Sequence, residues 1–226
     1  MREISENAFD IPVYGLIDAA HYLRVPYQTL RYWVCGRSSI EVEPIINPAA
    51  SGPPRLSFNN LMECHMLSAM RTQYNLRLPK VRKALKNLKA LYPSPHPLID
   101  KKLETDSISV FVRDYANDLI NLNQPNQRQF TEIISMYMRR IERDTHGMLV
   151  FFPFVEKRAV DEPRLIMITP AISFGRPVIS GTGISTAVIA SRFHARESVD
   201  ELAREYGRSN REIEEAIRWE SSSIAA

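Results

Sequence analysis

Residues 17–33 have the sequence IDAAHYLRVPYQTLRYW, in which a proline separates two short helical patterns. The first pattern repeats apolar residues on one helix face and places Asp18 in its first turn, where the helix dipole favours a carboxylate. Pro26 ends this pattern, because proline cannot extend a helix and restricts the residue before it. The second pattern runs from Tyr27 to Trp33. Two short helices joined by a tight turn predict a helix-turn-helix unit.

The second helix of this unit carries side chains that can reach the edges of bases and the phosphates of DNA. Leu30 and Trp33 remain to face the core. The alternative is an all-helical packing unit in which the Arg and Tyr side chains are ordinary surface residues. The candidate DNA-binding residues on this helix are Tyr27, Gln28, Thr29, Arg31 and Tyr32.

Residues 38–58 follow this unit and are rich in Pro, Gly and Ser, as turns and loops are. Two short β-like pieces occur in this stretch, at residues 45–46 and 55–58. We therefore expect a two-stranded wing with a loose tip over residues 48–54.

Two further helices are expected before residue 92, one capped by Asn59 or Asn60 and one that opens at Pro79. The stretch from residue 1 to residue 92 holds 12 Lys and Arg against 7 Asp and Glu, in a chain of 226 residues with a net charge of +3. A basic first third is typical of a nucleic-acid surface, although a similar excess also occurs on solvated helix faces.

Four stretches carry a resemblance to a known family, and they lie at residues 17–20, 30–33, 55–61 and 76–81. In this order they resemble the DNA-binding domain of MerR-type regulators. In that family the helix-turn-helix enters the major groove and the wing lies on the DNA backbone. The resemblance therefore implies that Arg31 and Tyr32 contact DNA and that Arg55 serves the wing. The long coiled coil of that family has no counterpart in the pattern that follows.

Residues 93–164 predict a central α+β connector. Residues 98–99 and 107–112 have strand patterns that indicate a β-hairpin, and residues 130–141 form an amphipathic helical pattern. The apolar run 149–154 is either core or a partner surface, and core is favoured because unsupported apolar patches are uncommon.

Residues 165–226 predict a strand over 165–168, a small glycine-punctuated hairpin over 172–185 and three short helices. Gly207 is placed to end the second of these helices in a left-handed conformation, and Ser209 or Asn210 is placed to cap the third. The first two helical patterns span residues 186–194 and 199–206.

The third of these helices is rich in carboxylates. Between Arg211 and Glu220 the sequence holds Glu212, Glu214, Glu215 and Glu220 against Arg211 and Arg218. Carboxylates repel phosphate, so we expect this unit to serve dimerisation or a protein partner rather than DNA.

The motifs at residues 175–182, 202–207 and 213–217 resemble a bacterial domain family found in VapB-type antitoxins, with a homeodomain-like three-helix unit. The resemblance implies a toxin partner, a PIN-type ribonuclease that uses acidic residues and a metal. It also implies that the chain represses its own operon. The candidate partner-binding residues are Phe151, Phe152, Phe154, Arg176, Ile213 and Trp219.

Other functional classes have little support in the sequence. No apolar run approaches the ~20 residues that a membrane-spanning helix needs. The N-terminus has no secretory signal, and two cysteines make no disulfide framework, so we expect a cytoplasmic protein without a membrane partner. The histidines are scattered without metal-ligand spacing, which predicts no zinc site, cofactor or catalytic group. Cys64 and His65 predict a buried cysteine beside a surface histidine.

The fold class predicted is α+β, mainly helical, in three parts at residues 1–92, 93–164 and 165–226. The leading hypothesis is a non-enzymatic antitoxin that binds double-stranded DNA at its own operator as a homodimer and also binds the ribonuclease. Two alternatives remain open: a ligand-responsive MerR-like regulator without a toxin, and a metal-dependent enzyme.

Overall fold

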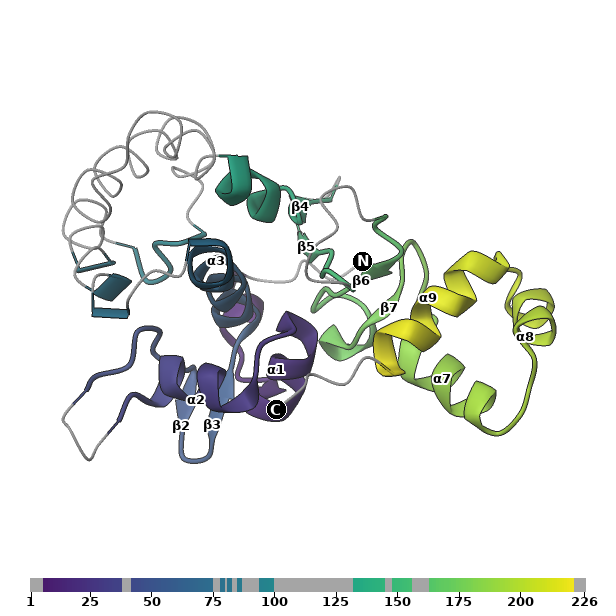
Figure 1. Cartoon of the computed structure of the whole chain (residues 1–226), viewed down its shortest axis with the longest axis horizontal. Helices are drawn as coiled ribbons and strands as arrows, with labels where there is room; N and C mark the ends of the chain where they lie inside the picture. Colours follow the sequence, from purple (N-terminus) through teal and green to yellow (C-terminus); the bar gives the residue numbers. More distant parts are fainter. Residues whose placement is uncertain are drawn as a thin grey trace.

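The computed structural model describes residues 6–37, 42–74, 78–79, 81–82, 85–86, 94–99, 132–144, 148–155 and 163–221. Helices of the N-terminal third lie at one end of the elongated molecule, helices of the C-terminal third lie at the other, and the strands between residues 141 and 179 lie between them (Figure 1). The expected class, α+β and mainly helical, is confirmed.

Three helices build the N-terminal end: α1 (Leu16–Leu23), α2 (Tyr27–Cys35) and α3 (Phe58–Tyr74). A turn of three residues, 24–26, joins α1 to α2. The backbone of Arg24 is left-handed, with φ of 52°, and this ends α1. The Pro26 carbonyl accepts the first backbone hydrogen bonds of α2. Leu30 and Trp33 are fully buried, so the prediction that they face the core is confirmed.

A two-stranded hairpin occurs within residues 38–58, but its strands differ from the prediction. β3 (Pro54–Leu56) pairs antiparallel with β2 (Ala50–Ser51) and, on its other side, with β1 (Tyr14–Gly15). Residues 45–46 were expected to form a strand and do not. Both are buried, and both donate their backbone N–H groups to the Trp33 carbonyl at the end of α2. The apolar pair therefore fills the core beneath α2 instead of extending the wing.

α3 is buried on nearly all sides from Phe58 to Met70. Its start is fixed by reciprocal hydrogen bonds between Ser57 and Asn60, so Ser57 caps it, two residues before Asn59 and three before Asn60. His65 is only 3% exposed, so the expected surface position of this histidine is wrong. Its buried residues include the polar side chains of Asn60, Glu63, His65 and Ser68 as well as apolar ones, and α1, η1 (Glu6–Asp10) and β3 pack against it.

The middle of the chain contributes a helical segment and a β-hairpin. Residues 132–138 are helical, and β4 (Ile141–Arg143) pairs antiparallel with β5 (Leu149–Phe151). Residues 98–99 lie in a turn and bend, not in a strand, while residues 107–112 lie outside the described residues. All three residues of β5 are buried, so the preference for core over partner surface is confirmed there.

The C-terminal third contains a strand within residues 165–168 and three helices. β6 (Ile166–Met167) pairs antiparallel with β7 (Val178–Ile179), and Val178 also forms a single antiparallel bridge with Ser185, at the end of the hairpin expected over 172–185. A short turn of 3₁₀ helix, η4 (Ser173–Gly175), lies between the two strands. The helices that follow are α7 (Thr186–His194), α8 (Val199–Tyr206) and α9 (Asn210–Ser221).

Local signals fix the ends of α8 and α9. Ser198 and Glu201 form a reciprocal capping box at the start of α8, and Gly207 ends this helix in the left-handed region with φ of 61°. Ser209 and Glu212 form the same pair of bonds at the start of α9. A backbone bridge between Phe151 and Ile168 joins the central hairpin to this third of the chain.

Among the helices described, none combines the length and the apolar character that crossing a bilayer requires.

Candidate nucleic-acid interface

The outer face of α2 presents three of the predicted DNA-binding side chains to solvent. Tyr27, Gln28 and Arg31 are exposed, and Thr29 is half-buried. The opposite face of the helix is anchored by Leu30 and Trp33, so the exposed side chains stand on a fixed support. The major groove of B-DNA is wide enough to admit an α-helix with an exposed polar face.

Tyr32 has a different environment from the other four candidates. It is half-buried, and the Arg82 guanidinium lies 5.3 Å from its ring centroid and 3.4 Å from its hydroxyl oxygen. Arg82 also donates two hydrogen bonds to the Glu43 carbonyl, at 3.0 and 3.2 Å. Tyr32 is therefore held against the support and is suited to positioning α2 rather than to reading a base.

A hollow of about 380 Å³ lies beside α2 and is lined by Gln28, Arg31, Tyr32, Gly36 and Arg37. The left-handed backbone of Gly36, with φ of 66°, turns the chain so that Arg37 lies next to Arg31. The sequence reasoning missed Arg37 and Arg82. The glycine directly before Arg37 could have indicated a turn that brings this arginine beside α2. The position of Arg82 could not be predicted in this way, because it depends on how its helical segment packs.

Arg55 is exposed on β3, as expected of a wing residue. Its guanidinium donates to the Val13 carbonyl at 3.2 Å, and its backbone pairs with Gly15 on one side and Ala50 on the other. The hydrogen bond restrains the side chain along the sheet, with its charge still open to solvent.

The end of α9 packs directly against α1 and the turn that leads into α2. The buried Arg24 donates from Nη2 to the Trp219 carbonyl at 2.6 Å, and its guanidinium carbon lies 4.1 Å from the centroid of the Trp219 ring. The Trp219 ring also stacks on Tyr22 and meets His21 edge-on. A cation at the last turn of a helix is favoured by the helix dipole. Two segments 195 residues apart are thereby joined at the helix-turn-helix.

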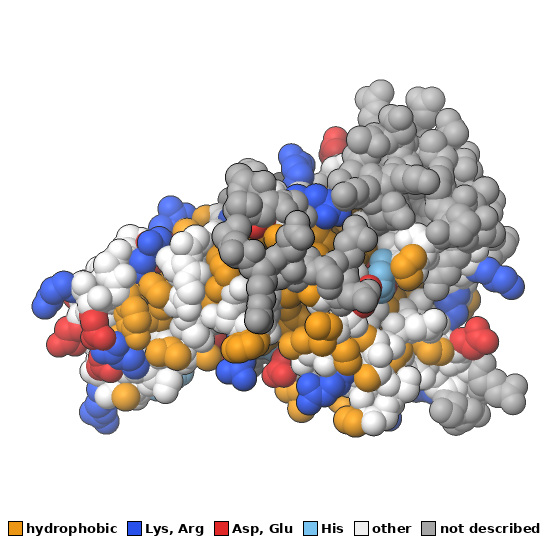
Figure 2. Space-filling model, turned by 180° about the vertical axis from the view of Figure 1, so that it is seen from behind, with side chains coloured by type: hydrophobic (Ala, Val, Ile, Leu, Met, Phe, Trp, Pro, Cys, Tyr) orange, Lys and Arg blue, Asp and Glu red, His pale blue; other side chains and the backbone are white. Residues whose placement is uncertain are grey.

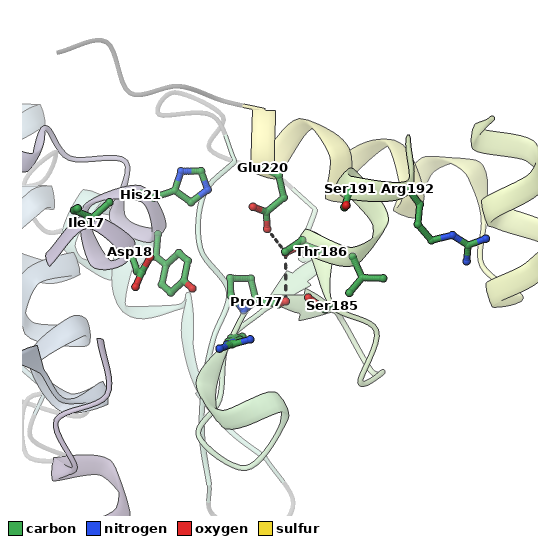
Figure 3. A pocket seen from close by; sticks show the side chains of 13 residues that line it. Ile17, Asp18, His21, Pro177, Ser185, Thr186, Ser191, Arg192 and Glu220 are labelled. Atoms are coloured by element: carbon green, nitrogen blue, oxygen red, sulfur yellow. Dashed lines mark hydrogen bonds between the residues drawn. The ribbon is translucent and has the colours of Figure 1, made fainter. Parts of the chain in front are cut away.

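A groove of about 710 Å³ opens beside this junction. Asp18 and His21 from α1 line one wall, and Ser185, Thr186 and Ser191 line the other, with Glu220 at the top (Figure 3). The Thr186 hydroxyl lies within hydrogen-bonding distance of the Glu220 carboxylate and 3.3 Å from the Pro177 carbonyl.

Tyr22 lines the same groove. Burial, together with the nearby carboxylates of Asp18 and Glu220, raises the pKa of Tyr22 to about 12, so its hydroxyl stays protonated and can donate. The groove therefore offers carboxylates, hydroxyl groups and the Arg176 guanidinium within one space.

The acids of α9 mostly face inward. Glu212 bonds Ser209 and Arg208, and the Arg208 guanidinium holds the pKa of that carboxyl below its ordinary value. Glu215 is buried and pairs with Arg218, and Glu220 bonds Thr186. Of the four carboxylates expected to repel phosphate, Glu214 is the one exposed to solvent.

The three-helix unit lies almost entirely within a segment that matches a known family model. Residues 166–219 match the family model described as "Protein of unknown function (DUF433)". We call residues 166–219 the DUF433 segment. It includes β6, β7, α7, α8 and all but the last two residues of α9. Its last residue, Trp219, makes the junction with α1.

Similarity also extends over nearly the whole chain. A Mycobacterium tuberculosis protein named "Putative antitoxin VapB45" is 27% identical over 243 residues, covering 94% of this chain and 95% of its own length. "Uncharacterized protein Rv2308" from the same organism is 23% identical and covers 94% of this chain and 92% of its own length. The crystal structure of Rv2018, also from M. tuberculosis, superposes with a TM-score of 0.69 at 23% identity, covering 93% and 99% of the two chains, which shows a shared fold.

Three of the predicted partner-binding residues belong to the core, so those predictions are wrong. Phe151, Ile213 and Trp219 are fully buried, the last two within the DUF433 segment. Phe151 packs edge-on against His65, with ring centroids 4.7 Å apart. An apolar side chain predicts burial but does not tell a core from an interface, which is why the assignment failed.

The other three partner candidates reach the surface to different degrees. Phe154 is half-buried beneath the Arg140 guanidinium, which lies 4.3 Å from its ring centroid. Phe152 is half-buried beside Arg164, at 5.4 Å. Arg176 is exposed at the rim of the groove. Arg176 is therefore the member of the set most available to a partner.

Proposed function

We propose that this chain is a DNA-binding antitoxin of a type II toxin–antitoxin pair, which neutralises a PIN-type ribonuclease and represses its own operon. The observation that carries the antitoxin role is the extent of the similarity to the protein named "Putative antitoxin VapB45", which covers 94% of one chain and 95% of the other. The similarity therefore includes the basic first third as well as the DUF433 segment. This role requires no cofactor and no catalysis by this chain, and it is exercised in the cytoplasm.

The exposed face of α2 supports the DNA-binding part of the proposal. Gln28 and Arg31 are side chain types that hydrogen-bond bases in the major groove, and Arg37, Arg55 and Arg82 supply positive charge for the phosphates. A helix-turn-helix reads one half-site, so the chain is proposed to act as a homodimer on a paired operator. The MerR-like docking mode, with the β2–β3 hairpin as the wing, belongs to the same proposal.

Growth rescue tests the antitoxin role. The proposed partner is a PIN-type ribonuclease whose gene lies beside this one, and such a protein is produced alone and then together with this chain. We expect growth arrest in the first case and growth in the second. Continued arrest with both proteins present in soluble form would refute the antitoxin role.

Replacing Arg31 by alanine tests the DNA interface. If Arg31 hydrogen-bonds a base, Arg31→Ala weakens binding to a labelled duplex from upstream of the gene by about 1–3 kcal/mol, measured by fluorescence anisotropy. The matched control is Arg211→Ala, which removes the same charge from the exposed face of α9.

Comparison of the two variants distinguishes the loss of a hydrogen bond to a base from the loss of one positive charge. Binding of both should fall as salt rises, because phosphate contacts release counterions. Equal affinity of wild type and Arg31→Ala, or equal losses in the two variants, would contradict the assignment of Arg31 to the DNA surface.

A second function is favoured by the groove at the junction. Its volume of about 710 Å³ would admit a small effector between α1 and α7, next to the helix-turn-helix, as a ligand-responsive regulator requires. The test is operator affinity with and without the low-molecular-weight filtrate of host cells, repeated with Val188→Trp, which fills the groove. A change in affinity that the variant abolishes would favour this regulator.

A further inference from the structure

The turn η4 holds an unusual backbone conformation. Ser173, Phe174 and Gly175 have φ of 49°, 55° and 76° in succession. Glycine adopts positive φ freely, but L side chains avoid this region because Cβ approaches the carbonyl oxygen. Two non-glycine residues are therefore held in an unfavourable conformation, and contacts around the turn must fix it.

Those contacts come from both ends of the chain. Gly175 donates its N–H to the Ile172 carbonyl at 3.0 Å, and Arg176 donates to the Ser173 carbonyl at 3.1 Å. The Ser173 hydroxyl lies 3.4 Å from the Gly183 carbonyl. On the other side, Gly175 packs so closely against Tyr14 of β1 that a Cβ there would lie 2.3 Å from the tyrosine oxygen. The turn is therefore fixed against the N-terminal sheet.

The fixed turn presents an apolar side chain to solvent. Phe174 is 89% exposed, the highest value among the exposed large hydrophobic side chains described. Arg176, two residues later, is also exposed, and among the described residues it takes part in no ion pair. Ile172, just before the turn, is half-buried and packs in a small apolar cluster with Phe152. Hydrophobic side chains interspersed with Lys and Arg extend across the rear face of the molecule (Figure 2).

We propose that Phe174 and Arg176 are the anchor by which this chain docks on its ribonuclease partner. This inference rests on the proposed antitoxin function. Aromatic and arginine side chains dominate the energy of protein interfaces, and a pre-organised anchor loses little entropy on binding. The matching surface on the partner is an apolar pocket that receives the Phe174 ring, bordered by a carboxylate that pairs with Arg176.

The surroundings of the turn favour a protein over DNA or a second copy of the chain. Asp18 and Glu220 line the groove that Arg176 borders, and these carboxylates oppose the closely spaced phosphates of DNA more strongly than a single carboxylate on a protein. A two-fold contact between copies centred on this turn would bring two Arg176 guanidinium groups together, which repel each other.

Binding of full-length variants to the purified ribonuclease tests the anchor. Phe174→Gly removes the ring and relieves the backbone strain, so the variant should bind at least about 30-fold more weakly while its unfolding midpoint stays equal or rises. Arg176→Glu should weaken binding at least about 10-fold by reversing the charge. The matched control is Phe193→Ala on α7, which removes a 38% exposed ring and should leave the Kd unchanged.

The same protein samples are also tested for binding to DNA from upstream of the gene, and their oligomeric mass is measured. If the wild-type chain does not bind the ribonuclease, the antitoxin function and the anchor both fail. If the wild type binds and Phe174→Gly binds equally well, the anchor alone is refuted. Loss of DNA binding, or a change of oligomeric mass, in Phe174→Gly with ribonuclease binding intact would assign the turn to DNA or to a second copy and would also overturn the proposal.

Discussion

Replacement of Trp219 by alanine is expected to destabilise the protein by about 3–5 kcal/mol, the usual cost of removing a fully buried tryptophan. The side chain is fully buried and contacts His21, Tyr22 and Arg24. Its loss leaves a cavity and also removes the aromatic face over which the buried Arg24 guanidinium lies. The Trp219 carbonyl that Arg24 caps remains, so the ring accounts for the effect.

Chemical unfolding followed by circular dichroism measures this change, because the signal does not depend on the tryptophan removed. Trp219→Phe keeps an aromatic face over Arg24 and should lose less stability. Glu214→Ala, on the exposed face of α9, should stay within about 0.5 kcal/mol of wild type. A Trp219→Ala variant as stable as wild type would show that α9 does not hold α1 in solution.

The unfolding free energy is expected to fall steeply below pH 6.5 because of His65. Complete burial, with a smaller effect of the nearby Arg140 charge, lowers the pKa of His65 to about 3, against a hydrogen bond to the Tyr137 carbonyl that raises it. Since a carbonyl only accepts, Nε2 carries the proton in this 3.2 Å contact and the ring is neutral. Below pH 6.5 the unfolded chain binds a proton that the folded chain excludes. Stability therefore falls by about 1.4 kcal/mol per pH unit from this residue alone.

Comparison of two variants isolates the His65 contribution from the carboxylates that titrate in the same range. His65→Gln cannot titrate but can still donate to the Tyr137 carbonyl, so its stability relative to wild type should rise as the pH falls from 6.5 to 5. His194→Gln removes an exposed histidine and should keep the wild-type slope. Parallel curves for wild type and His65→Gln would contradict the burial of a neutral ring.

The elements predicted correctly from sequence are those whose ends are determined by interactions between residues close in the sequence. The ranges predicted for α7 and α8 match the structure to the residue, and the end of α8 was predicted from Gly207, which acts within one helical turn. The exposed face of α2 likewise follows from helical periodicity. The candidate DNA-binding residues could be proposed for this reason.

The parts that could not be predicted depend on distant contacts. Arg24 meets Trp219 across 195 residues, and no local pattern marks either residue for the other. Residues 45–46 have the composition of a strand but are used to bury the end of α2. No pattern in the sequence marked Phe174 as an exposed side chain, because its exposure depends on the packing of Gly175 against Tyr14.

We propose that one chain binds both its own operator and its ribonuclease at the same time. A mobility-shift experiment with a duplex from upstream of the gene distinguishes joint binding from binding of either partner alone. The chain should retard this duplex but not a scrambled one, and added ribonuclease should produce a still slower complex. Equal retardation of the two duplexes would contradict binding to the operator. A protein–duplex complex whose mobility does not change when the ribonuclease is added, together with a failure to rescue growth, would contradict binding to the ribonuclease.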